Sequence, residues 1–196
     1  MTRLAAYAVA GLTSLLLIAL FARALPDAAE RAKDGYHRVH ELACEALRPT
    51  DSSPVLGTFP QSAPDFTLKD YAGRDVTLSS LKGNVVLVSF WATWCKTCVV
   101  EMPSMEKLVA HMKGRPFRLL AVSVDEQWDD VRRFFAKGTV LDILLDPART
   151  IAKRYGTEKF PETFIVDKDG TVRYFVVSDR DWTQPDVAAC LDAMVD

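Results

Sequence analysis

The sequence has few histidines and cysteines, and it carries no excess of positive charge. Its 196 residues include three histidines and four cysteines. Because 24 Lys and Arg residues face 26 Asp and Glu residues, the net charge is −2 and gives no indication of a nucleic-acid partner. Four cysteines are too few for a disulfide scaffold in a chain of this length, and they allow three pairings. The apolar fraction of 49% is typical of a globular protein.

Charge is also absent from residues 4–22, which lie between Arg3 and Arg23. As a helix this stretch would cross about 30 Å of hydrocarbon, and it is longer than the core of an ordinary signal peptide. We therefore expect residues 1–25 to form an N-terminal transmembrane anchor. A cleaved signal is the alternative, because Ala22-Arg23-Ala24 resembles a cleavage site. In either case the rest of the chain is exported.

Residues 26–62 are predicted to be a helical spacer followed by a linker. Apolar residues recur at helical spacing as far as Leu47, Pro49 ends the pattern, and residues 48–61 are rich in Pro, Ser, Thr and Gly. His37, His40 and Cys44 fall on one face of this helix. That face is either packed or solvated, or it forms a metal site, or Cys44 forms a disulfide with another chain.

Residues 63–196 are predicted to form one α/β domain. Residues 84–91 are a continuous apolar run, as in a central strand buried on both faces. The other predicted strands are a hairpin over 65–78 and the segments 117–124, 140–145, 164–166 and 172–177. The predicted helices start at Cys98 and cover 127–137, 148–155 and a last segment that begins near Pro185. Cys190 lies on the apolar stripe of that last helix, where we expect an unpaired thiol that packs as a small hydrophobe.

The motif with chemical content is Cys95-Lys96-Thr97-Cys98, which follows the buried strand and opens an amphipathic helix. Free N–H groups and the dipole at a helix N-terminus stabilise an anion, so a thiolate is favoured there. We expect Cys95 to be the attacking thiol and Cys98, one turn further along, to be the resolving thiol.

Two other interpretations of the motif are an inert structural bridge and half of a zinc site. Zinc would need a second Cys or His pair, and the predicted domain offers only His111 and Cys190. Attachment of a c-type haem is excluded because Val99, not histidine, follows Cys98. No cofactor and no metal are therefore expected.

Residues 90–98, Phe-Trp-Ala-Thr-Trp-Cys-Lys-Thr-Cys, followed by Glu101-Met102-Pro103, resemble the TlpA/ResA/CcmG branch of the thioredoxin superfamily. The resemblance covers about residues 63–196. It implies a thioredoxin-like fold with an N-terminal β-hairpin and a central insertion of a strand and a helix. It also implies an anchored domain that faces the periplasm or cell exterior.

The resemblance assigns roles to further residues. Pro161 matches the cis-proline beside the cysteines, and the backbone of Phe160 would pair with an extended substrate segment. Glu101 matches an acidic residue that tunes thiol pKa and proton transfer, although a solvated helix-face glutamate is the alternative. Trp94 should be partly exposed beside Cys95. The chain departs from thioredoxins proper, which carry Gly-Pro where Lys96-Thr97 stand, and Ser89 replaces their buried aspartate.

The expected function is that of an extracytoplasmic thiol-disulfide oxidoreductase. By resemblance, it reduces disulfides in exported proteins such as apocytochromes c and receives electrons from an integral-membrane dithiol donor in the cytoplasmic membrane. One alternative is a thiol peroxidase. Peroxiredoxins need Thr or Ser three residues before the reactive cysteine, and Ala92 at that position argues against this alternative. The other is a copper-binding module of the Sco type, against which no histidine follows His111.

Overall fold

The computed structural model describes residues 31, 44–47, 53 and 55–196. The chain divides into two compact units, residues 1–42 and 43–196. Within the described part, no helix combines the length and apolar character needed to cross a membrane. The anchor predicted for residues 1–25 and most of the helix predicted for residues 26–47 lie outside that part. Glu45–Leu47 form a short 3-10 helix, η1.

The centre of the second unit is a six-stranded mixed sheet with the strand order β1-β8-β7-β4-β5-β6. Strands β4, β5 and β6 run parallel, whereas β7, β8 and β1 are joined in antiparallel pairs. A separate antiparallel hairpin consists of β2 (Thr67–Lys69) and β3 (Asp75–Thr77), as predicted. The sheet strands are β1 (Gln61–Ser62), β4 (Val85–Trp91), β5 (Phe117–Ser123), β6 (Asp142–Leu145), β7 (Glu162–Val166) and β8 (Thr171–Val177).

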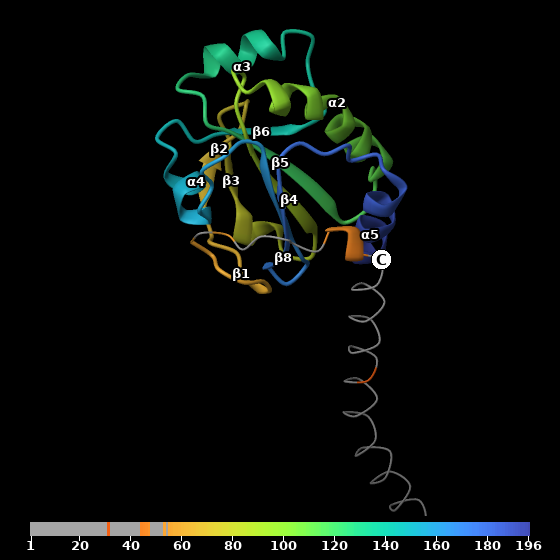
Figure 1. Cartoon of the computed structure of the whole chain (residues 1–196). Helices are drawn as coiled ribbons and strands as arrows, with labels where there is room; N and C mark the ends of the chain where they lie inside the picture. Colours follow the sequence, from red (N-terminus) through yellow and green to blue (C-terminus); the bar gives the residue numbers. More distant parts are fainter. Residues whose placement is uncertain (1–30, 32–43, 48–52, 54) are drawn as a thin grey trace, which may run out of the picture. The chain divides into compact units, whose positions relative to one another are not determined.

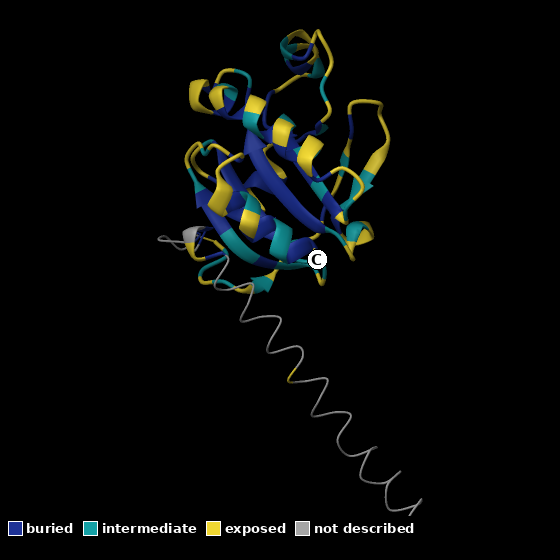
Figure 2. Cartoon of the chain, turned by 90° about the vertical axis from the view of Figure 1, so that its right-hand side faces the viewer, coloured by how far each residue is buried: buried dark blue, intermediate teal, exposed yellow. Residues whose placement is uncertain are grey.

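Strand β4 is the buried central strand that the apolar run predicts. All seven of its residues are buried, and it pairs with β5 on one side and β7 on the other. Its side chains alternate between two layers of the core: Phe90 contacts the rings of Tyr155 and Phe164, and Trp91 contacts those of Phe134 and Phe135. Figure 2 shows this continuous buried centre between the helices.

Four helices surround the sheet (Figure 1). Helices α2 and α5 lie on one side of it and α4 lies on the other. The helices are α2 (Lys96–His111), α3 (Trp128–Phe134), α4 (Thr150–Tyr155) and α5 (Pro185–Val195). All four fall where the sequence predicts helices, although α3 ends three residues before the predicted boundary. Pro185 occupies the first turn of α5, where its missing N–H costs no hydrogen bond.

One strand was not predicted. Gln61 was assigned to the end of the linker, but Gln61–Ser62 form β1, which pairs with Val172 and Thr171 of β8. The prediction failed because two polar residues show neither apolar alternation nor β-branched side chains, so only their backbone pairing identifies them as a strand.

One prediction about the outer cysteines was wrong, and two of the alternatives left open for Cys44 are excluded. Cys44 and Cys190 form a disulfide within the chain, across 146 positions of sequence. Cys190 is therefore not an unpaired thiol, and Cys44 is available neither to a metal nor to a second chain. Both residues are fully buried, and Leu47 packs into the same core. Helical spacing placed Cys190 on the inner face of α5 correctly, but it carries no information about a partner so distant in sequence.

Replacing Cys44 and Cys190 together by alanine should lower the free energy of unfolding by about 3–5 kcal/mol, because the bridge closes a long loop and so restricts the unfolded chain. Urea unfolding of the oxidised protein measures this loss. Thiol titration in denaturant provides the control, since neither protein should contain a free thiol. An unchanged unfolding midpoint would contradict a stabilising role for this disulfide.

Candidate active site at the Cys95–Cys98 disulfide

The two motif cysteines lie where β4 passes into α2. Cys95 is the N-cap residue of α2 with an extended backbone (φ −86°, ψ 106°), and it forms a disulfide with Cys98. The preceding loop is held by Asp125, a buried residue that directly follows Val124. The carboxylate of Asp125 accepts hydrogen bonds from the backbone N–H and the hydroxyl of Thr93, at 3.0 and 2.8 Å, and from the hydroxyl of Ser123 at 2.6 Å.

The sulfur of Cys95 occupies the position that a side-chain oxygen takes in an ordinary helix cap. The backbone N–H of Cys98 points at Sγ of Cys95 over 3.2 Å, and the Thr97 hydroxyl lies 3.4 Å from the same sulfur. In the reduced protein these two groups can donate to a thiolate. Cys95 is 8% exposed and Cys98 is fully buried. The prediction that the second cysteine is the more shielded is confirmed.

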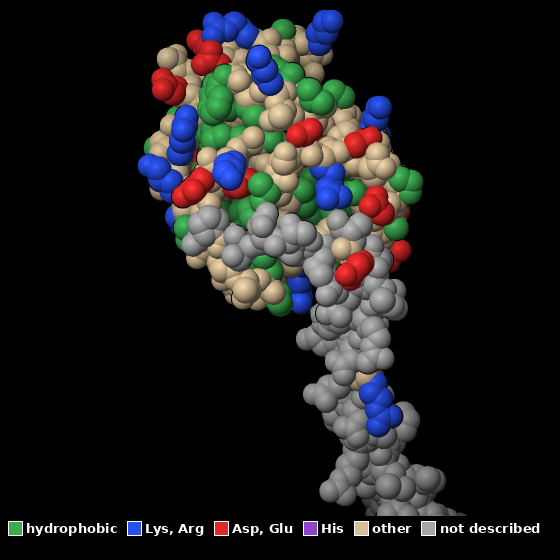
Figure 3. Space-filling model, viewed as in Figure 1, with side chains coloured by type: hydrophobic (Ala, Val, Ile, Leu, Met, Phe, Trp, Pro, Cys, Tyr) green, Lys and Arg blue, Asp and Glu red, His purple; other side chains and the backbone are tan. Residues whose placement is uncertain are grey.

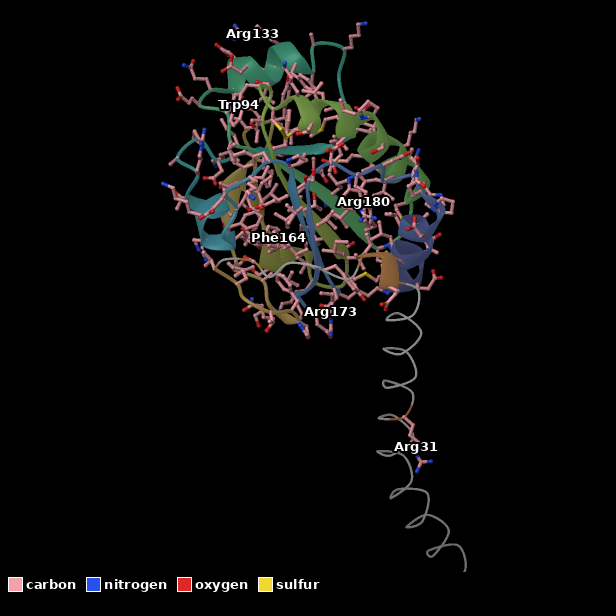
Figure 4. All side chains as sticks on the ribbon, viewed as in Figure 1. Arg31, Trp94, Arg133, Phe164, Arg173 and Arg180 are labelled. Atoms are coloured by element: carbon pink, nitrogen blue, oxygen red, sulfur yellow. A yellow bond between two sulfur atoms is a disulfide. The ribbon has the colours of Figure 1, made fainter. Side chains whose placement is uncertain are left out.

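Aromatic residues flank Cys95 from two loops. The Phe160–Pro161 peptide bond is cis, as the resemblance implied, and the carbonyl oxygen of Phe160 lies 3.5 Å from Sγ of Cys95. Trp94 is 57% exposed and meets the Phe160 ring edge-on, with 5.8 Å between centroids. Figure 4 places Trp94 at the surface near the start of α2, and Figure 3 shows apolar side chains in the same part of the surface. The predicted partial exposure of Trp94 is confirmed.

Glu101 is buried, so the alternative of a solvated helix-face glutamate is wrong. It lies three residues after Cys98 on α2 and is 2% exposed. The indole N–H of Trp182 donates to its Oε1, whereas Oε2 has no partner among the described residues. Burial raises the pKa of Glu101 to about 7, against the opposing effect of the Trp182 hydrogen bond.

A second buried carboxyl group, Glu162, directly follows the cis-proline. It is 4% exposed, it lies opposite Phe90 of β4 in the sheet register, and its Oε2 has no partner within the described structure. Burial raises the pKa of Glu162 to about 7. No role is predicted for Glu162 from the sequence. Glu162 begins a strand that has no exposed position. A charged residue at the start of such a strand is the signal that could have identified it as a site residue.

The structure thus brings together Cys95, Cys98, Trp94, Phe160 and Pro161, and it places Glu101 one turn along α2 from Cys98. The roles predicted for these residues stay predictions. Lys96 and Thr97 are both exposed in the first turn of α2. Asp125, Glu162 and Trp182 were not predicted as site residues. The described residues contain no cluster of three or more His, Cys, Asp or Glu side chains that could hold a metal ion.

Known proteins are similar to this chain in sequence and in fold. The AhpC/TSA family model matches residues 60–175. Thiol-disulfide oxidoreductase ResA of Geobacillus thermodenitrificans is 34% identical over 134 residues, which cover 68% of this chain and 76% of that protein. A crystal structure of a Chlorobium tepidum protein assigned as thiol:disulfide interchange protein DsbE has 29% identity and a TM-score of 0.66, and the match covers 71% of this chain and 99% of that chain.

The fold and the matches define the class first: a thioredoxin-like α/β protein, in which a disulfide lies at the start of helix α2. The chain belongs to the AhpC/TSA family and, within it, to the thiol-disulfide oxidoreductases related to ResA and DsbE. It is therefore an enzyme of thiol-disulfide exchange.

Glu101→Gln should change how stability depends on pH. The folded protein holds a proton on Glu101 up to about pH 7, whereas an unfolded glutamate releases it near its ordinary value of 4.5. The wild-type free energy of unfolding must therefore fall as pH rises from about 4.5 to 7. The free energy of unfolding of the variant minus that of wild type should therefore be about 3 kcal/mol larger at pH 8 than at pH 4.

Urea unfolding of the two oxidised proteins across this pH range gives the difference directly. Because only the change with pH is compared, any constant cost of burying the amide cancels. Glu106→Gln on the same helix is the matched control for loss of a carboxylate. A stability difference that stays constant with pH would mean that burial does not raise the pKa of Glu101 above its value in the unfolded chain.

Proposed function

We propose that the protein reduces disulfide bonds in exported proteins, apocytochromes c among them, at the outer face of the cytoplasmic membrane. In this proposal residues 1–25 anchor the enzyme, and an integral-membrane dithiol protein supplies its electrons. The observation that carries the proposal is the sulfur of Cys95 at the N-cap of α2, where the N–H of Cys98 donates to it. A thiolate in that position is both stabilised and next to the surface.

The first chemical step is attack of the Cys95 thiolate on a substrate disulfide. A bond forms between Sγ of Cys95 and one substrate sulfur, and the other substrate sulfur leaves as a thiolate that takes up a proton. Trp94 and Phe160 border Cys95, so the substrate chain would lie across them. The Phe160 carbonyl, 3.5 Å from the attacking sulfur, is placed to accept a backbone hydrogen bond from that chain.

The second step is resolution by Cys98. Its thiol loses a proton and attacks Sγ of Cys95, which releases the second substrate thiolate and closes the Cys95–Cys98 disulfide. Residues three apart on a helix are neighbours, so Glu101 lies on the same buried side of α2 as Cys98. A carboxyl group with a pKa of about 7 exchanges protons readily at neutral pH, which suits it to take the Cys98 proton.

The overall reaction consumes two electrons and two protons for each substrate disulfide reduced. The electrons must return to Cys95–Cys98 from a dithiol that is oxidised in turn. An oxidising exterior cannot supply them, so a donor that crosses the membrane fits an anchored enzyme. Relatives named thiol-disulfide oxidoreductase and thiol:disulfide interchange protein support the exchange chemistry of this proposal.

Trapping with a Cys98→Ser variant tests the mechanism and the substrate class together. The variant should accumulate mixed disulfides between Cys95 and exported cysteine proteins, since the resolving thiol is missing. Adducts are isolated from cells under acid quench and identified after release with dithiothreitol. Cys95→Ser is the matched control and should capture nothing.

Three results would contradict the proposal. If Cys98→Ser forms no adduct that depends on Cys95, disulfide reduction by this pair fails. If the reduced wild-type protein instead turns over hydrogen peroxide in the steady state, the peroxidase alternative replaces it. Protease added outside intact spheroplasts should cleave the domain, and protection there would contradict the proposed location.

A further inference from the structure

The arginine at position 149 stacks on both aromatic rings that border Cys95. Its guanidinium carbon lies 5.6 Å from the centroid of the Trp94 ring and 6.0 Å from that of Phe160. Trp94 directly precedes Cys95, and the Phe160 carbonyl touches its sulfur. Trp94 and Phe160 therefore lie between the guanidinium and Sγ of Cys95. Arg149 itself comes from the loop before α4.

The guanidinium has no anionic partner in the described part of the chain. The side chain is exposed and takes part in no ion pair or side-chain hydrogen bond with a described residue. Elsewhere in the domain, arginines at positions 74, 115, 118, 132, 133 and 173 are all paired with aspartates. Arg149 thus keeps its donors open beside the site while its guanidinium lies against the Trp94 and Phe160 rings.

The backbone conformation at position 149 does not itself favour arginine, so the reason for an arginine here lies in its side chain. Arg149 has φ 54° and ψ 28°, a left-handed conformation that glycine adopts at lower cost than arginine. The turn itself is built by Asp146, whose carboxylate accepts the N–H groups of residues 150, 151 and 152. Since Asp146 already satisfies those donors, the anion-binding capacity here rests on the guanidinium.

We infer that Arg149 binds an acidic side chain of the substrate, an Asp or Glu within about three residues of the cysteine that Cys95 attacks. Planar guanidinium groups bind carboxylates with two parallel hydrogen bonds, which also fixes orientation. Lys96 and Lys159 are both exposed and adjacent in sequence to Cys95 and Phe160, so they add positive charge near the site. This inference rests on the function proposed above and specifies the substrate of that site.

The test uses the wild-type protein in its reduced form and pairs of disulfide peptides with blocked termini. Within a pair, one position between three before and three after the cysteine carries Glu or Gln, so a single carboxylate is the only difference. At one position or more, kcat/KM for the Glu peptide should exceed that for the Gln peptide by about fivefold at low ionic strength. The ratio should shrink as salt is added.

Three variants connect the ratio to this side chain. Arg149→Gln and Arg149→Gly should bring it to about one, whereas Arg149→Lys should retain only part of it. Arg154→Gln is the matched control, because it removes the same charge from an exposed position of α4 away from both rings, and it should leave the ratio intact. Arg149→Gly should melt no lower than wild type, because glycine relieves the left-handed backbone.

The outcomes separate the two proposals. Equal turnover of Glu and Gln peptides by wild type, or a ratio that survives Arg149→Gln, overturns the role of Arg149 while disulfide reduction stands. Failure of wild type to reduce any of the peptides removes the proposed function, and this inference with it.

Discussion

The capping of α2 by a sulfur atom is the interaction on which the site depends. Strand β4 is buried along its whole length and paired on both sides, so its last residue is fixed in place, and Asp125 then fixes the loop that follows. Cys95 is in this way held at the one point where the helix needs an acceptor. In the proposed mechanism the group that caps the helix is also the nucleophile, so the charge that the helix stabilises is the charge that the reaction uses.

The protonation of the carboxyl groups near the cysteines is linked to the negative charge of the Cys95 thiolate. A thiolate at Cys95 already places one negative charge in a poorly solvated region, and ionised Glu101 and Glu162 would add two more. Each of these acids is buried with one oxygen unpartnered among the described residues, and each has a pKa raised to about 7. At neutral pH each group is about half protonated, which limits the negative charge of the site. This protonation also leaves a proton reservoir beside Cys98, the thiol that must ionise second.

Local patterns in the sequence predict the elements, whereas contacts between distant residues could not be predicted. The apolar run before Cys95 and the spacing after Cys98 identify β4 and α2, and the resemblance adds the cis-proline and Glu101. No local pattern indicates that Trp182, 81 positions away, donates to Glu101, or that Cys44 meets Cys190. Nor does an arginine in a Pro-Ala-Arg segment indicate a left-handed backbone. These features arise only from the tertiary structure, which brings together segments that are distant in the sequence.

The molecule contains two disulfides with opposite requirements, and their positions explain how both can persist. Cys95–Cys98 must exchange with external thiols, while Cys44–Cys190 must survive in the same protein during those cycles. Exchange requires a thiolate to approach a sulfur directly, and only Cys95 of the four cysteine residues has measurable exposure. The Cys44–Cys190 bridge is fully buried, so a donor that docks beside Trp94 has no path to it. A stable second disulfide also needs an oxidising compartment to form, which supports the proposed export of the domain. Burial, not the number of cysteines, thus separates the bridge that stabilises the fold from the bridge that reacts.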